Sequence, residues 1–383
     1  MKTTEQLISK TSQVSDYTAI EQMLWEVLEQ NEVMRLHCNE TAFDIPQNLK
    51  QQLVNKMVNV SWNRYPDFHQ TKLHTLVANQ AGLTPENIIL GNGSSQLIQQ
   101  MINCCSKFLS EAIIENPTFT LYHQICQNEQ MPYRNWNISE ENTFDLNTFP
   151  QVNEPSLIIL TSPNNPTGLS LPLATLQTLL KKHANCIFII DEAYGEFGEQ
   201  SVLPLVNEYA NLLVLKTLSK GYGLPSIRFG YAAGSTSLIN LIKKYTSPFT
   251  INIFTELVVT EFLSNPEYIN ALKVNQARVK NLRDFVFFLL DEMSDETSFK
   301  VLPSTANFLL LRFHDANLLE HIKTTLTARN ILLSYPMTQC LRLTIGTEVE
   351  MMQVVRLIQY TLNQHKYASA DLTEAQSTKE IIG

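Results

Sequence analysis

A lysine in the middle of the chain stands where it could do covalent chemistry. Lys220 belongs to the segment 216–221, K-T-L-S-K-G, which directly follows the apolar run 212–215. A lysine at the end of a buried strand loses solvation, which lowers its pKa and frees its amine to form a Schiff base with an aldehyde. An exposed lysine without a catalytic role is the ordinary alternative. The segment alone leaves both interpretations open.

Two acids follow another apolar run. Asp191 and Glu192 come after residues 187–190, a pattern typical of a strand that is buried on both faces. In open α/β sheets, ligands bind beyond the carboxyl ends of the strands, where these acids would lie. A solvated strand end without function is the alternative. The chain has no G-x-x-x-x-G-K-S/T loop, so the acids do not indicate a nucleotide hydrolase of that class.

A glycine-rich turn, G-N-G-S-S-Q, occupies residues 91–96 between an expected strand and an expected helix. Backbone N–H groups and hydroxyls at the start of a helix can bind a phosphate. Gln96 stands where a dinucleotide-binding turn has its third glycine, so the turn favours a phosphate over NAD. A tight turn with a serine cap explains the same residues equally well.

The fourth segment is the turn S-P-N-N-P-T-G at residues 162–168, after the apolar run 157–160. Proline, asparagine and glycine dominate turns, so alone it could be an ordinary loop. The combination is more informative. A phosphate-binding turn, an asparagine-rich turn, an acid and a lysine follow one another within one region of expected strands. Together they fit pyridoxal 5'-phosphate.

The composition limits the partners and the compartment. The chain has 383 residues, a formal net charge of -9 and 44% hydrophobic residues. It can bury a large core, and it is a poor candidate for broad binding to nucleic acid or anionic lipid. No stretch is apolar enough to span a bilayer, and the first residues lack a signal-peptide pattern. Six scattered cysteines without metal-like spacing predict reduced thiols and a cytoplasmic protein.

The apolar runs indicate an α/β fold. Between about residues 85 and 235, continuous apolar runs alternate with helical patterns, as expected for a mainly parallel sheet with crossover helices. After Ser235, helical patterns and strand-like runs at 307–313 and 341–345 predict a smaller α+β domain.

We therefore predict four parts along the chain. An N-terminal arm, 1–45, contains a helix over 16–30 and packs with the small domain. A large domain covers 46–245, a small domain covers 246–366, and a flexible tail covers 367–383.

The ordered motifs S-P-N-N-P-T-G, D-E-A-Y, T-L-S-K and R-x-G-Y resemble those of the fold-type I pyridoxal-phosphate-dependent aminotransferases of class I/II. The nearest branch is histidinol-phosphate aminotransferase, with threonine-phosphate decarboxylase close to it. The resemblance runs from Leu36 to Leu362. It implies a large domain with a mainly parallel seven-stranded sheet, a smaller α+β domain, pyridoxal 5'-phosphate as cofactor, and transfer of an amino group between an amino acid and a 2-oxo acid.

The resemblance also implies roles for individual residues. The catalytic residues are Lys220, Asp191 and Tyr194. Lys220 binds the cofactor covalently and moves a proton, while Asp191 pairs with the protonated ring nitrogen. Tyr194 and Asn165 donate to or accept from the 3'-oxygen of the ring, and Phe119 stacks on its face.

The phosphate of the cofactor is assigned, by the same resemblance, to a group of small residues and one arginine: Gly93, Ser94, Ser95, Thr217, Ser219 and Arg228. Tyr65 reaches that phosphate from the neighbouring subunit, so the resemblance implies a homodimer.

Substrate binding falls to Arg342, Asn307 and Asn39. Arg342 matches the arginine that binds the substrate carboxylate in this family, or the phosphate in the histidinol-phosphate branch. That branch usually has a second arginine where this chain has Ser334. One cation fewer favours a plain amino acid as substrate.

Other reactions share this scaffold. A decarboxylase, or a biosynthetic lyase or cyclase, would use the same cofactor residues, because the reaction depends on which substrate bond stands perpendicular to the ring. A ligand-binding regulator derived from this fold is disfavoured by the acidic chain and by the absence of an expected DNA-binding module.

Overall fold

The computed structural model describes residues 33–382, with side chains up to Tyr367. The helix expected over 16–30 lies outside the described residues. The described chain begins with β1 (Met34–Arg35), which pairs in parallel with β11 (Ile331–Leu332). Within the described part, no helix combines the length and apolar character that a membrane span requires.

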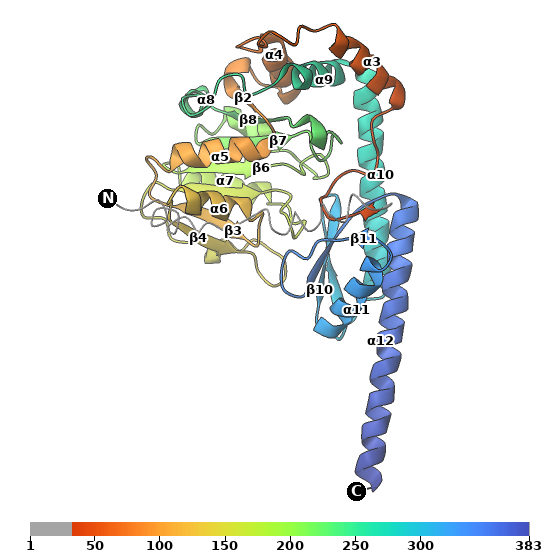
Figure 1. The fold of residues 1–383 in the computed structure, drawn as a ribbon. Coiled ribbons are helices and arrows are strands. Elements are labelled where there is room, and N and C mark those ends of the chain that lie inside the picture. The colour runs from red at the N-terminus through yellow and green to blue at the C-terminus, as the bar shows by residue number, and fades with distance from the viewer. Residues whose placement is uncertain (1–32, 383) are drawn as a thin grey trace, which may run out of the picture.

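A seven-stranded sheet forms the core of the larger part of the molecule (Figure 1). In order across the sheet, its strands are β2 (Ile88–Gly91), β8 (Gly230–Gly234), β7 (Leu212–Thr217), β6 (Ile187–Asp191), β5 (Leu157–Thr161), β3 (Ala112–Asn116) and β4 (Tyr133–Asn137). Strand β8 runs antiparallel to both of its neighbours, and the other pairs are parallel. The predicted α/β fold with a mainly parallel seven-stranded sheet is confirmed.

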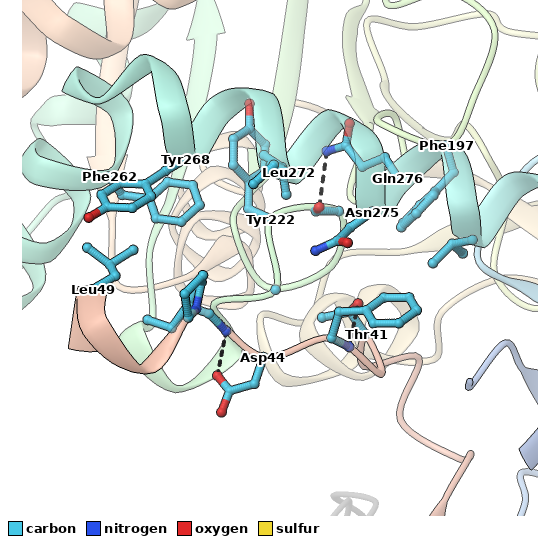
Figure 2. Close-up of a pocket in the computed structure, with 17 residues that line it drawn as sticks. Thr41, Asp44, Leu49, Phe197, Tyr222, Phe262, Tyr268, Leu272, Asn275 and Gln276 are labelled. Atoms are coloured by element: carbon cyan, nitrogen blue, oxygen red, sulfur yellow. Dashed lines mark hydrogen bonds between the residues drawn. The ribbon is translucent and has the colours of Figure 1, made fainter. Parts of the chain in front are cut away.

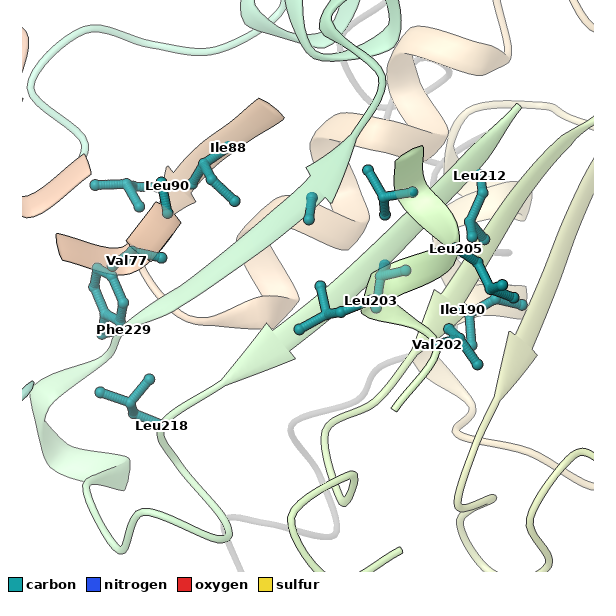
Figure 3. Close-up of a cluster of buried hydrophobic side chains, with 14 of the residues drawn as sticks. Val77, Ile88, Leu90, Ile190, Val202, Leu203, Leu205, Leu212, Leu218 and Phe229 are labelled. Carbon is teal, nitrogen blue, oxygen red and sulfur yellow. The ribbon is translucent and has the colours of Figure 1, made fainter. Parts of the chain in front are cut away.

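Helices cover both faces of this sheet because its central strands are apolar on both sides. One face carries α4 (Thr71–Ala81), α7 (Leu173–Lys182) and α9 (Ile253–Ser264), with α3 (Gln47–Val58) beside α9. The other face carries α5 (Ser94–Cys105), α6 (Leu121–Asn128) and α8 (Thr236–Lys243). In β5, Ile158 packs on the first face and Ile159 on the second, so the continuous run serves both. Figure 3 shows part of the first cluster, including Leu90 and Ile190.

A second core forms around a three-stranded antiparallel sheet with β10 at its centre. Its elements are β9 (Phe299–Leu302), β10 (Phe308–Phe313), β12 (Cys340–Thr344), α10 (Pro266–Asp291), α11 (Ala316–Thr327) and α12 (Glu348–Ile382). Helix α10 runs alongside both parts (Figure 1): Leu272 packs against the first core, and Val286 belongs to the second. The domain boundary at 245/246 stays a prediction.

Helix α12 extends to Ile382 and projects from the body of the molecule (Figure 1). The segment expected to be a flexible tail, 367–383, therefore begins inside this helix. Helical structure in the segment does not measure its mobility, so its flexibility stays a prediction.

A buried ion cluster lies beneath the turn that follows β6. The Nζ atom of Lys216 lies 2.8 Å from Glu196 Oε1 and 3.2 Å from Glu192 Oε2. Burial alone would lower the pKa of Lys216, but the two carboxylates outweigh burial and raise it. Gly221 passes close above them, since a Cβ built there would lie 2.5 Å from Glu196 Cβ. The cluster thus supports both the segment after Asp191 and the loop that carries Lys220.

Replacing this lysine should destabilise the fold strongly. Lys216→Met leaves two buried carboxylates without their cation, and we expect a loss of about 3–5 kcal/mol in the free energy of unfolding. Urea unfolding followed by circular dichroism measures the loss. Lys107→Met is the control, because Lys107 pairs with Glu129 at a half-exposed surface site and should cost at most about 1 kcal/mol. Equal losses in the two variants would contradict the assigned role of the cluster.

Candidate active site

The candidate residues gather at the carboxyl ends of the central strands. Thr161, at the end of β5, pairs in register with Asp191 at the end of β6, and β7 ends beside them at Thr217. Parallel strands place their carboxyl ends along one edge, and loops from that edge carry ligand-binding residues in open α/β sheets. The topology therefore brings together segments that are up to 56 residues apart between Thr161 and Thr217.

Asp191 is a buried acid with two hydrogen-bond donors. Its side chain is 3% exposed, and it accepts from Tyr122 Oη at 2.7 Å and from the Ala193 N–H at 2.8 Å. Burial raises the pKa of Asp191 to about 6, although both hydrogen bonds act in the opposite direction. A cation placed against this carboxylate would favour its charged form.

The glycine turn and Arg228 form a cradle for an anion. Gly93 caps α5 with a φ of 77°, and Ser94 and Ser95 are the first two residues of that helix. A Cβ at Gly93 would lie 2.5 Å from Nη2 of Arg228, so only glycine lets the guanidinium approach the turn. A helix N-terminus with a guanidinium beside it suits a phosphate.

Two hydroxyls extend this cradle. Thr217 Oγ1 donates to Ser219 Oγ at 3.0 Å, and Nη1 of Arg228 donates to the same Ser219 oxygen at 3.4 Å. Ser219 also donates its backbone N–H to Thr217 Oγ1 at 3.1 Å. The six residues predicted to bind the cofactor phosphate thus lie around one location.

Lys220 lies at the start of the loop after β7. Its Nζ donates to the carbonyl oxygen of Cys38 at 2.6 Å. The next residue, Gly221, accepts from Gln276 Nε2 on α10 at 3.0 Å. Figure 2 shows a pocket between α10 and this loop, which is lined by residues that include Tyr222, Phe262 and Leu272. None of the predicted site residues lines this pocket, so it is separate from the candidate site.

Three successive carbonyl groups of the segment 37–39 receive donors from the site. The carbonyl of residue 37 accepts from Arg342 Nη2 at 2.5 Å, that of residue 38 accepts from Lys220, and that of residue 39 accepts from Asn307 Nδ2 at 3.1 Å. Arg342 and Asn307 belong to the second core, and Lys220 follows the large sheet. The segment therefore joins the two parts of the molecule at the site.

Asn39 supports Tyr194. Its Nδ2 donates to Tyr194 Oη at 2.8 Å, while its Oδ1 accepts from Thr344 Oγ1 at 3.0 Å. Tyr194 is also packed edge-on against Phe308, with ring centroids 5.2 Å apart. These contacts orient the tyrosine, so the structure gives Asn39 a supporting position beside a predicted catalytic residue.

Arg342 is the cation of the second core that faces the site. It is 9% exposed, and its Nη1 donates to Asn165 Oδ1 at 2.5 Å. The residue paired with it across the sheet edge is Ser334, whose carbonyl accepts from the Arg342 N–H at 2.7 Å. The structure therefore places Ser334 opposite Arg342, and its match to the second arginine of the histidinol-phosphate branch stays a prediction.

The two aromatic residues predicted to contact the cofactor, Phe119 and Tyr65, differ in exposure. Phe119 is partly buried and meets Tyr122 edge-on, with centroids 5.9 Å apart. Tyr65 is 81% exposed and stacks on Phe249 at 4.6 Å. Phe119 thus lies beside the Asp191 network, whereas Tyr65 points outward from a surface rich in aromatic residues.

Three residues of the site were not predicted. Tyr122 donates to Asp191 from the first turn of α6 (Leu121–Asn128), and no motif in the sequence marked it. Glu115 directly follows the apolar run 112–114, as Asp191 follows the run 187–190, and the argument from position after an apolar run applies to both acids. His37, whose burial lowers its pKa, acts through its carbonyl oxygen and left no signal in the sequence.

Comparisons with known proteins agree with this geometry. The model of the family "Aminotransferase class I and II" matches residues 31–358. The histidinol-phosphate aminotransferase of Clostridium kluyveri is 30% identical over 83% of this chain and 90% of its own length. That of Prosthecochloris aestuarii is 29% identical over 83% and 88%.

A solved structure shows the same fold. Histidinol-phosphate aminotransferase from Sinorhizobium meliloti, solved in complex with pyridoxal-5'-phosphate, superposes with a TM-score of 0.76 at 19% identity, over 91% of this chain and 98% of the other. The resemblance drawn from the sequence motifs is confirmed, and with it the fold type. The chain belongs to the class I and II aminotransferase family.

Proposed function

We propose that this aminotransferase transfers the amino group of histidinol phosphate to a 2-oxo acid. The observation that carries the proposal is the buried guanidinium of Arg342, which lies against Asn165 and can bind the anionic end of a substrate. The names of the curated relatives at 29% and 30% identity support histidinol phosphate as that substrate.

The cofactor of the enzyme is pyridoxal 5'-phosphate, and the site has the chemistry to hold it. The cradle of Gly93 and Arg228 suits its phosphate, because a helix N-terminus and a guanidinium meet there. The buried carboxylate of Asp191 suits its ring nitrogen in the cationic form. When bound, the cofactor supplies an aldehyde that receives the amino group and a ring that withdraws electrons.

We assign the remaining roles to residues around these two anchors. The amine of Lys220 would hold the aldehyde of the cofactor and, in its free form, would accept a proton from the amine-bearing carbon of the substrate. Tyr194 and Asn165 would hold the 3'-oxygen of the ring, and Phe119 would cover the ring. The hydroxyls and backbone of Ser94, Ser95, Thr217 and Ser219 would hold the phosphate. Asn307 and Asn39 support the substrate side.

A plain α-amino acid is the second candidate substrate. Ser334 lies across from Arg342 and carries no charge, so a doubly charged phosphate would meet one cation fewer there. A single guanidinium matches a single carboxylate in charge and in bidentate geometry.

We further propose that the enzyme is a homodimer of the cytoplasm. Trp62, Tyr65 and Phe68 expose 69%, 81% and 59% of their surface, and Phe249 adjoins Tyr65 and Phe68. Large exposed aromatic groups of this kind mark interaction surfaces. None of the six cysteines forms a disulfide, which suits a reducing compartment.

Lys220→Ala should abolish covalent capture of the cofactor. After borohydride reduction of the wild-type enzyme, mass spectrometry should find the cofactor mass on the peptide that contains Lys220, and the variant should show none. Its visible absorbance and its turnover should disappear as well, while its unfolding midpoint stays near that of the wild type. Capture of the cofactor on another lysine, or retained turnover, would refute the assignment.

The substrate is tested by mixing the enzyme with histidinol phosphate, histidine or glutamate and following the absorbance of the bound cofactor. Conversion by histidinol phosphate supports the proposal, conversion by plain amino acids alone supports the second candidate, and release of carbon dioxide indicates a decarboxylase. Arg342→Ala should raise KM for the accepted substrate by about tenfold or more, because a charge-assisted hydrogen bond is lost.

Arg312→Ala is the matched control, since Arg312 lies on the neighbouring strand β10 and donates to the Glu140 carbonyl. Its KM should stay near the wild-type value. A larger effect at Arg312 than at Arg342 would move substrate binding away from Arg342.

Tyr65 should act across subunits. Tyr65→Ala alone should weaken cofactor binding, and Lys220→Ala alone should be inactive. A mixed dimer of the two variants regains one complete site, so at limiting cofactor its activity should approach half of the wild-type value. Activity no higher than that of Tyr65→Ala would show that the tyrosine acts within its own chain.

A further inference from the structure

A second buried acid, Glu115, lies at the same edge of the sheet as Asp191. It is the second-last residue of β3 and is 0% exposed. Its Oε1 accepts three hydrogen bonds, from the Thr161 N–H at 2.5 Å, from Asn164 Nδ2 at 2.9 Å and from Thr118 Oγ1 at 3.1 Å. A buried carboxylate that gathers three donors fixes the position of each of them.

One of these donors controls the asparagine-rich turn. Asn164 uses its Oδ1 to accept from both the N–H and the Oγ1 of Thr167, at 3.1 and 2.8 Å. Its carbonyl accepts from the Gly168 N–H at 2.8 Å. Glu115 therefore holds the residue that closes the turn, and the next residue along the chain is Asn165, which faces Arg342.

A chain of hydroxyl groups links Glu115 to Asp191. Thr161 Oγ1 lies 3.3 Å from both Thr118 Oγ1 and Tyr122 Oη. Thr118 Oγ1 donates to Glu115 and Tyr122 Oη donates to Asp191, at 3.1 and 2.7 Å. The hydroxyl of Thr161 has one proton, so it donates to either Thr118 or Tyr122, and the two acids share one cluster of hydroxyl groups.

We propose that Glu115 is a positioning residue for the cofactor site: as a hydrogen-bond acceptor, it sets the place of Asn165 through Asn164. The inference rests on the proposed role of Asn165. It concerns the acceptor at Oε1, since Oε2 is buried and has no hydrogen-bond partner.

The environment agrees with a specialised role. Burial raises the pKa of Glu115 to about 7, although the hydrogen bonds from Thr161 and Asn164 oppose this. A carboxyl group in such a place costs stability, and a well-packed apolar residue would avoid that cost.

If Glu115 acts as a hydrogen-bond acceptor, two substitutions at this position should differ in cofactor affinity. Glu115→Gln keeps an oxygen at Oε1 and puts an NH2 group where Oε2 has no partner, so it should bind pyridoxal 5'-phosphate within about threefold of wild-type affinity. Glu115→Ala removes the acceptor and should weaken binding by tenfold or more.

Affinity is measured on the cofactor-free proteins by fluorescence titration, and the unfolding midpoint of each is recorded. Glu111→Ala is the control, because Glu111 precedes the same strand and pairs with Arg134 near the surface; its affinity should not change. Equal affinity of Glu115→Ala and wild type would overturn the inference, even with a lowered midpoint. Equal losses in Glu115→Gln and Glu115→Ala would overturn it too.

The wild-type titration separates this inference from the proposed function. A wild-type protein that binds no cofactor overturns both. A wild type that binds, together with a Glu115→Ala variant that binds equally well, overturns the inference alone.

Discussion

The site depends on keeping the carboxylate of Asp191 charged where water cannot reach it. The strand that carries it is buried on both faces, and only 3% of the residue is exposed. Two donors, Tyr122 and the Ala193 N–H, recover part of the lost solvation, and burial still raises the pKa of Asp191 to about 6. A cationic ring nitrogen would recover more, so the burial that disfavours the charge in the protein alone also selects a cationic partner.

Other buried charges near Asp191 also have partners that compensate for the loss of water. Lys216 pairs with both Glu192 and Glu196 beneath the turn that follows Asp191, in a place that is buried from water. Arg342, which is buried beside the second core, donates to Asn165 and to the carbonyl oxygen of His37. In each case a buried charge has a defined partner, and those partners fix the loops that carry the other site residues.

Much of this arrangement could be predicted from the sequence. Five strands, β2, β3, β5, β6 and β7, were marked by continuous apolar runs, because strands covered on both faces need apolar residues at every position. Strands β4 and β8 lack such runs: β4 reads Y-R-N-W-N at the sheet edge, and β8 reads G-Y-A-A-G. These two segments form strands because they pair with neighbouring strands of the sheet, and their local sequence patterns do not predict this.

The site divides in a similar way. Residues with chemistry of their own, such as Lys220 and Asp191, stand out by type and by their position after a strand. Residues that act by contacting another site residue, such as Tyr122, can be identified only from the folded structure. The hydrogen bond from Tyr122 to Asp191 joins residues that are 69 positions apart in the sequence. The role of Asn39 as a support for Tyr194 is of this second kind.

The segment 37–39 offers the site main-chain oxygens in place of side-chain groups. A carbonyl is present whatever the residue, so the bonds from Arg342 and Lys220 to positions 37 and 38 put no demand on the amino acids there. Packing still restricts the buried side chain of His37, whereas Cys38 is exposed. A change of residue at position 38 would therefore keep the attachment of Lys220, and a search for invariant residues would miss this contact between the two parts of the enzyme.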